Sequence, residues 1–183
     1  VFPAAILQAP FYDLHQSSSA NYGGIGAVIA HEISHAFDLN GASFDEHGSL
    51  KNWWKPEDYE AFTARTQKVI EQFDGQDSYG AKVNGKLTVS ENIADLGGIA
   101  AALEAAKKEA DFSAEEFFTN FARIWRMKAR PEFMQMLASV DVHAPGKLRT
   151  NVQLPNFDDF FTTFDVKEGD GMWRKPEDRV IIW

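Results

Sequence analysis

The sequence predicts a mainly helical domain with a few short strands, an α+β fold class. Apolar residues recur at helical spacing over several long segments, and helix-start signals precede many of these segments. The stretches that favour strands are short and are bounded by proline or glycine. The 183 residues suffice for one domain with a buried core, which we place at 1–183.

The first predicted elements are an edge strand and a long helix. Residues 1–12 are apolar, and Pro3 and Pro10 favour an edge strand that runs into a loop. Residues 21–39 carry a broad apolar stripe, which predicts a helix with one buried face. The members of this stripe are Ile25, Val28, Ile29, Ile33, Ala36 and Phe37.

Helices also dominate the rest of the chain. Pro56 opens a helix over 57–73, and the polar residues 74–87 predict a loop or a short hairpin around Asn84-Gly85. Four more helices follow, with one short helix expected in the otherwise irregular segment 140–156. Their expected ranges are 89–110, 113–129 with a Ser113/Glu116 capping box, 131–139, and 157–164 with Asn156 as cap.

Composition excludes several classes of protein. The formal net charge of -9 argues against a nucleic-acid partner, which would need clustered cations. The absence of cysteine excludes a disulfide framework and any cysteine-based metal site. No apolar run of about 18 residues is present, so we expect no membrane segment. The chain starts at Val1 without a signal-peptide pattern, and we interpret it as a fragment of a longer protein.

The segment His31-Glu32-Ile33-Ser34-His35 is an HExxH motif. Histidines four residues apart lie on one face of a helix, so both imidazoles can reach a single Zn²⁺. Glu32 projects beside them, where it can take a proton from zinc-bound water. The apolar residues around the motif recur at helical spacing, which supports the helical setting that this chemistry needs.

A catalytic zinc needs a third protein ligand. Glu91 and Asp95 are again four residues apart, which suggests Glu91 as the ligand and Asp95 as an outer partner that orients a ligating imidazole. The alternative is that both acids only favour the start of their helix. Asp38, three residues after His35, either supports the site or is a solvated acid at a helix end.

Five motifs together carry a resemblance to a known family. They are VFPAAILQAPF, NYGGIGAVIAHEISHAFD, the GxxFDxxGxLxxWW pattern from Gly41 to Trp54, SENIADLGG and VDVHAPGKLR. In this order they resemble the catalytic C-terminal portion of the neprilysin family of zinc metallopeptidases. Without cysteine, the chain is similar to the bacterial endopeptidase-O-like members. The resemblance implies a zincin, thermolysin-like catalytic domain that lacks its upstream helical lobe.

The resemblance also implies roles for individual residues. His31, His35 and Glu91 would bind one zinc ion, and Glu32 would be the general base. Supporting acids would be Asp95 and Asp38, His143 would stabilise the tetrahedral intermediate, and Arg149 would hold a substrate carbonyl. The residues that match the family's apolar substrate pocket are Ile6, Phe11, Val28, Ile124 and Trp125, for which core packing is the alternative. The edge strand near Pro3 would pair with an extended peptide.

These implications define the expected function. We expect a zinc metalloendopeptidase that hydrolyses short peptides on the amino side of hydrophobic residues. Alternatives are a non-catalytic zinc-binding module that recognises peptides, and a zinc hydrolase of non-peptide amides. The expected partners are peptides and the missing lobe, and the expected location is the bacterial cytoplasm.

Overall fold

The computed structural model describes residues 1–182, and most of them lie in helices, as the sequence predicted. The α-helices are α1 (Ser18–Asn21), α2 (Ala27–Ser34), α3 (Pro56–Phe73), α4 (Gly85–Ala106), α5 (Ala114–Ile124), α6 (Pro131–Val140), α7 (Gly146–Asn151) and α8 (Asp158–Phe164). A π-helical turn, Tyr22–Gly26, joins α1 to α2, and a 3-10 turn, His35–Phe37, extends α2. Shorter 3-10 turns are Ala4–Ile6, Gly41–Ser43, Leu154–Asn156 and Pro176–Asp178. One antiparallel hairpin, β1 (Asp77–Ser78) with β2 (Ala81–Lys82), is the sheet within the described residues.

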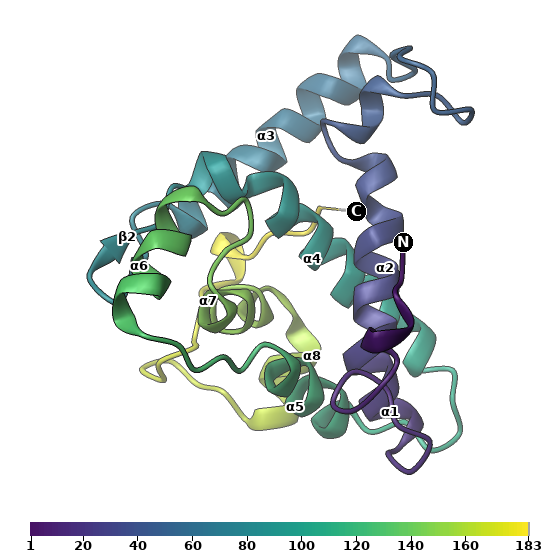
Figure 1. Cartoon of the computed structure of the whole chain (residues 1–183), viewed down its shortest axis with the longest axis vertical. Coiled ribbons are helices and arrows are strands. Elements are labelled where there is room, and N and C mark those ends of the chain that lie inside the picture. The colour runs from purple at the N-terminus through teal and green to yellow at the C-terminus, as the bar shows by residue number, and fades with distance from the viewer. Residues whose placement is uncertain (183) are drawn as a thin grey trace.

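Helix α4 lies in the middle of the molecule, with α2 beside it and α3 packed against it (Figure 1). It separates two apolar clusters and contributes to both: Ile93 and Leu96 belong to one, Ile99 and Leu103 to the other. Residues 92–99 are all buried, as expected of a helix enclosed on every side. Packing therefore fixes the position of any functional residue on this part of α4.

A glycine allows α2 and α4 to approach closely. A Cβ at Gly98 would lie 2.7 Å from the carbonyl oxygen of Ala27 and 2.7 Å from the backbone nitrogen of His31. Any larger residue would push the helices apart. The contact holds the histidine motif of α2 beside the acidic motif of α4.

The predicted edge strand over residues 1–12 is wrong. The segment forms a 3-10 turn, Ala4–Ile6, in which the backbone nitrogen of Ile6 donates to the carbonyl of Pro3. The hairpin β1–β2 lies elsewhere, and the described chain holds no other sheet with which residues 1–12 could pair. The backbone of the turn forms local hydrogen bonds instead. The segment is anchored at Phe11, whose carbonyl accepts from the backbone nitrogen of Ile25 at 2.7 Å.

Several predicted boundaries are corrected. Asn84 does not form the hairpin turn; its side chain accepts from the nitrogens of Lys86 and Leu87 and starts α4 there. The hairpin turns instead at Tyr79 and Gly80, both with positive φ. Helix α5 ends at Ile124, five residues before the predicted 129. Asn156 caps no helix: its Oδ1 accepts from three donors, which belong to Gln72, Arg174 and Val180.

The predicted buried stripe of the long helix is wrong for most of its residues. The helical run extends from Ser18 to Phe37, and Ile25 is buried. In contrast, Ile29, Ile33 and Phe37 are 39%, 61% and 43% exposed. The buried side of α2 is the side that faces α4, and it is the polar one.

Candidate active site

Two helices bring three potential metal ligands together. Helix α2 and its extension supply His31 and His35, and α4 supplies Glu91. The two Nε2 atoms lie 3.2 Å apart. The Oε2 atom of Glu91 lies 3.2 Å from Nε2 of His31 and 3.4 Å from Nε2 of His35.

This triangle has the size that zinc requires. Ligand atoms about 2.0–2.1 Å from a tetrahedral zinc ion are about 3.3–3.4 Å from one another. The three distances in the site, 3.2, 3.2 and 3.4 Å, agree with that edge length. In addition, Oε2 of Glu91 is buried and accepts no hydrogen bond, although imidazole nitrogens surround it. A cation shared by these atoms would satisfy it, so the residues fit a zinc ion.

His31 is held by a buried carboxylate on α4. Its Nδ1 lies 2.8 Å from Oδ1 of Asp95, and this contact directs Nε2 towards Glu91. Asp95 is bound in turn by Arg149, with Nε at 2.8 Å and Nη2 at 2.6 Å. The guanidinium carbon of Arg149 lies 3.6 Å from the ring centroid of Trp125.

The charges in this group stabilise one another. Burial raises the pKa of Asp95, but the Arg149 guanidinium and the His31 imidazole outweigh it and hold the pKa below its ordinary value. For Glu91, burial is again outweighed, here by His143, His31 and His35, so its pKa is also well below the ordinary value. Both carboxylates are therefore anionic, as zinc ligands and their supporting acids need to be.

His35 is held from its own side of the site. Its Nδ1 lies 2.9 Å from Oδ2 of Asp38, which is 1% exposed. The other oxygen of Asp38 accepts from the backbone nitrogens of Asn40 and Gly41, each at 2.8 Å. The hydrogen bond with Asp38, with a further contribution from Glu91, raises the pKa of His35 to about 10 in the absence of a metal.

His143 also reaches the site, from the segment before α7. Its Nε2 lies 3.1 Å from Oε2 of Glu91, and its Nδ1 lies 2.9 Å from Oδ1 of Asp141. The same Asp141 oxygen accepts from the backbone nitrogen of His143. Sequence reasoning missed Asp141 as the residue that orients His143, although the Asp-x-His spacing, typical of an Asx turn, was a signal for it.

Glu32 lies between the two histidines on α2 but points away from the buried side. Its side chain is exposed, and within residues 1–182 it has no hydrogen bond or ion pair. A carboxylate one residue from His31 is therefore accessible to solvent.

Four of the five predicted pocket residues lie in one apolar cluster: Phe11, Val28, Ile124 and Trp125. The rings of Phe11 and Trp125 meet edge to face, with centroids 6.4 Å apart. Ile6 is half-buried in its 3-10 turn and is not part of this cluster. Trp125 contacts Arg149, Arg149 binds Asp95, and Asp95 contacts His31. These contacts connect the cluster to the potential metal ligands.

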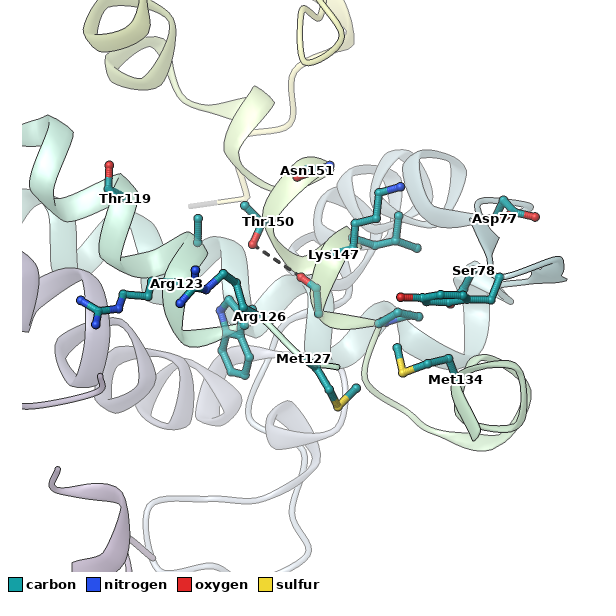
Figure 2. Close-up of a pocket in the computed structure, with 16 residues that line it drawn as sticks. Asp77, Ser78, Thr119, Arg123, Arg126, Met127, Met134, Lys147, Thr150 and Asn151 are labelled. Atoms are coloured by element: carbon teal, nitrogen blue, oxygen red, sulfur yellow. Dashed lines mark hydrogen bonds between the residues drawn. The ribbon is translucent and has the colours of Figure 1, made fainter. Parts of the chain in front are cut away.

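A separate hollow of about 970 Å³ is shown in Figure 2, and Trp125 is one of the residues that line it. Arg126 and Met127 line it after α5, and Lys147 lines it from α7. None of the three potential zinc ligands lies on its wall. The size of a cavity therefore does not identify the metal site, whose donor atoms lie where two helices meet.

Comparisons with known proteins agree with this geometry. Residues 1–180 match the model of peptidase family M13. The chain is 63% identical over 183 residues to the neutral endopeptidase of Lactococcus lactis subsp. lactis (strain IL1403), covering 100% of the chain and 29% of that protein. It is 38% identical over 200 residues to neprilysin of Oryctolagus cuniculus, covering 100% of the chain and 26% of that protein.

Solved structures show the same similarity. The crystal structure of PEPO from Lactobacillus rhamnosis HN001 (DR20) matches with a TM-score of 0.95 and 48% identity, covering 100% of this chain and 29% of that one. Zinc metalloprotease ZMP1 of Mycobacterium tuberculosis, in complex with inhibitor, matches with a TM-score of 0.92 and 40% identity. The match covers 100% of this chain and 30% of that one. The chain thus spans less than a third of the relatives that it matches.

The family resemblance of the five sequence motifs is confirmed, as is the mainly helical fold class. On the match over residues 1–180 and on its similarity to these proteins along its whole length, the chain belongs to peptidase family M13, the neprilysin family.

Proposed function

We propose that this chain is the catalytic part of a zinc metalloendopeptidase that hydrolyses short peptides on the amino side of hydrophobic residues. The observation that carries the proposal is the triangle of His31, His35 and Glu91, whose edges of 3.2–3.4 Å suit a zinc ion. Its relatives in the family support the proposal, since they include proteins named neutral endopeptidase and neprilysin.

In the proposed reaction, the metal and the side chains have separate roles. Zinc supplies Lewis acidity, which polarises a carbonyl and makes water more acidic. In our proposal Glu32 takes a proton from the attacking water and delivers it to the leaving amine. Its exposure and its lack of a partner within the described chain suit a group that must receive and release a proton.

His143 and Arg149 have the complementary task of stabilising negative charge on the substrate. His143 lies beside Glu91, with Asp141 fixing its ring, so we propose that it donates to the oxyanion that forms during attack. Arg149 uses Nε and Nη2 to hold Asp95. Because a guanidinium has five N–H donors, the remaining ones are available for a substrate carbonyl.

The preference for hydrophobic residues rests on the cluster around Trp125. Phe11, Val28 and Trp125 are only partly buried, while Ile124 is buried. An apolar side chain of the substrate would cover the exposed part of these residues, which favours binding by about 25 cal/mol for each Å² of apolar surface removed from water.

We also propose that the chain packs against a further part of a longer protein. The supporting observations are that it spans 29% of the Lactococcus neutral endopeptidase and that Ile29, Ile33 and Phe37 form an exposed apolar row on α2 and the 3-10 turn after it. Apolar rows of this kind are typical of surfaces that another part of a protein covers. Within residues 1–182, no helix is both long and apolar enough to cross a bilayer.

The test is Glu32→Gln in the full-length protein, with metal analysis and a quenched-peptide assay. We expect one zinc per chain in wild type and variant, and at least about a 100-fold lower turnover in the variant, in line with general-base contributions of about 10²–10⁴. Glu60→Gln, an exposed glutamate on α3, is the matched control and should retain turnover.

Unchanged turnover in the Glu32→Gln protein with zinc bound would exclude Glu32 as the base. A wild-type protein that binds zinc and peptides but cleaves none would instead favour the alternative, a non-catalytic module for peptide recognition.

A further inference from the structure

We propose that Ser90 is a positioning residue of the metal site, because it ties the helix that carries Glu91 to the carboxylate that holds His35. This inference rests on the zinc site of the proposed function. Sequence reasoning assigned no role to Ser90. Its position directly before Glu91 on α4 makes it a neighbour of the site, and its hydrogen bonds suggest what it does.

The hydroxyl of Ser90 has a defined direction. Its Oγ lies 2.6 Å from Oδ2 of Asp38, the same oxygen that lies 2.9 Å from Nδ1 of His35. Nδ2 of Asn40 donates to Oγ of Ser90 at 3.3 Å. A serine hydroxyl has one proton, and because a carboxylate can only accept, that proton points to Asp38.

Six other hydroxyls of helical residues bond differently. They donate back to the backbone carbonyl four residues earlier, as is usual for serine and threonine in helices. These are Thr66, Thr88, Ser139, Thr150, Thr162 and Thr163. Ser90 departs from this pattern and bonds to a buried carboxylate outside its helix.

The bond adds a link between the two segments that carry the ligands. Helix α2 is also linked to α4 directly, for example where His31 bonds to Asp95. The partner of His35, in contrast, is Asp38, which lies at the end of the α2 segment. Among the groups that hydrogen-bond the Asp38 carboxylate in the described chain, Ser90 is the one that belongs to α4.

The link acts at the edge of the fully buried part of α4. Residues 92–99 of α4 are buried, but Ser90 and Glu91 are only partly so. Core packing therefore holds Asp95 firmly and holds Glu91 less firmly. The hydrogen bond to Asp38 adds a fixed point directly beside Glu91, which keeps its carboxylate 3.4 Å from Nε2 of His35.

The experiment compares Ser90→Ala and Ser90→Thr in the full-length protein. Zinc affinity is measured by competition with a chelator, and the ligand geometry by the visible absorption of the Co²⁺-substituted protein. We expect Ser90→Ala to weaken zinc binding about 10–100-fold, as is usual for outer partners of metal ligands, and to change the Co²⁺ spectrum. Ser90→Thr keeps the hydroxyl and should restore both.

Ser139→Ala is the matched control, since it removes a hydroxyl that bonds only within α6, and it should leave zinc affinity unchanged. If Ser90→Ala binds zinc within about twofold of wild type with the same Co²⁺ spectrum, Ser90 has no positioning role. Equal losses in Ser90→Ala and Ser90→Thr, together with a lower melting temperature of both metal-free proteins, would also overturn it. A wild-type protein that binds no zinc would refute the proposed function itself.

Discussion

Helices α2 and α5 differ in whether their apolar residues are buried or exposed. Helix α5 buries Phe117, Phe118 and Phe121 and exposes Glu115, as its periodicity predicts. Helix α2 buries polar residues and leaves an apolar row exposed. On its buried side lie His31 and Ser34, and Asp38 follows on the same side; on its outer side lie Ile29 and Ile33.

The difference shows how a helix that carries metal ligands differs from a helix that carries none. Buried polar groups need hydrogen-bond partners, and each polar residue on the inner side of α2 has one. His31 bonds to Asp95, Asp38 to several donors, and the hydroxyl of Ser34 to the carbonyls of His31 and Ala94. The candidate site therefore lies where a helix departs from the usual pattern of buried apolar and exposed polar residues.

Asp95→Asn, on α4, should disturb the polar contacts on the inner side of α2 most strongly. The change leaves the buried Arg149 without its carboxylate and weakens the partner of His31. We expect a loss of about 3–5 kcal/mol in the free energy of unfolding and about a 10–100-fold weaker zinc affinity. Urea denaturation of the metal-free protein and chelator competition measure the two effects.

Asp159→Asn provides the control for a charge on the surface. Asp159 pairs with the exposed Lys107, and we expect a cost of at most about 1 kcal/mol. Asp95→Asn would contradict the buried network if it were as stable as this control.

Phe118→Ala tests α5, which carries no metal ligand. The ring is 1% exposed and contacts Phe117 and Phe160, so its removal should cost about 3–5 kcal/mol. The zinc affinity of the folded protein should not change, because the ring touches no potential ligand. A tenfold loss of zinc affinity in the folded variant would show that α5 and the metal site are coupled.

Ile33→Ser should have the smallest effect. Ile33 is 61% exposed, so in the 183-residue chain the free energy of unfolding should change by less than about 0.5 kcal/mol. Ile99→Ser, the same change at a residue of α4 that is 1% exposed, should cost more than about 2 kcal/mol. Urea denaturation distinguishes them, and equal costs would show that the outer face of α2 is covered within the chain itself.

Much of the site was predictable because its residues are neighbours along helices. The four-residue spacing places His31 with His35, and Glu91 with Asp95, on single faces whatever the rest of the fold does. The same periodicity predicted α3 and α6 to within one residue at each end. The starts of helices with a proline in the first turn were predictable for the same local reason.

Only the tertiary structure decided which faces are buried and which groups meet. The edge strand failed because a strand needs a neighbour to pair with, and nothing within residues 1–12 states where a neighbour lies. Ser90 was missed because its partner, Asp38, is 52 residues away in the chain and reaches it only through the packing of α2 against α4. Spacing within one helix is set by the backbone, whereas contacts between helices depend on how their surfaces fit, as at Gly98.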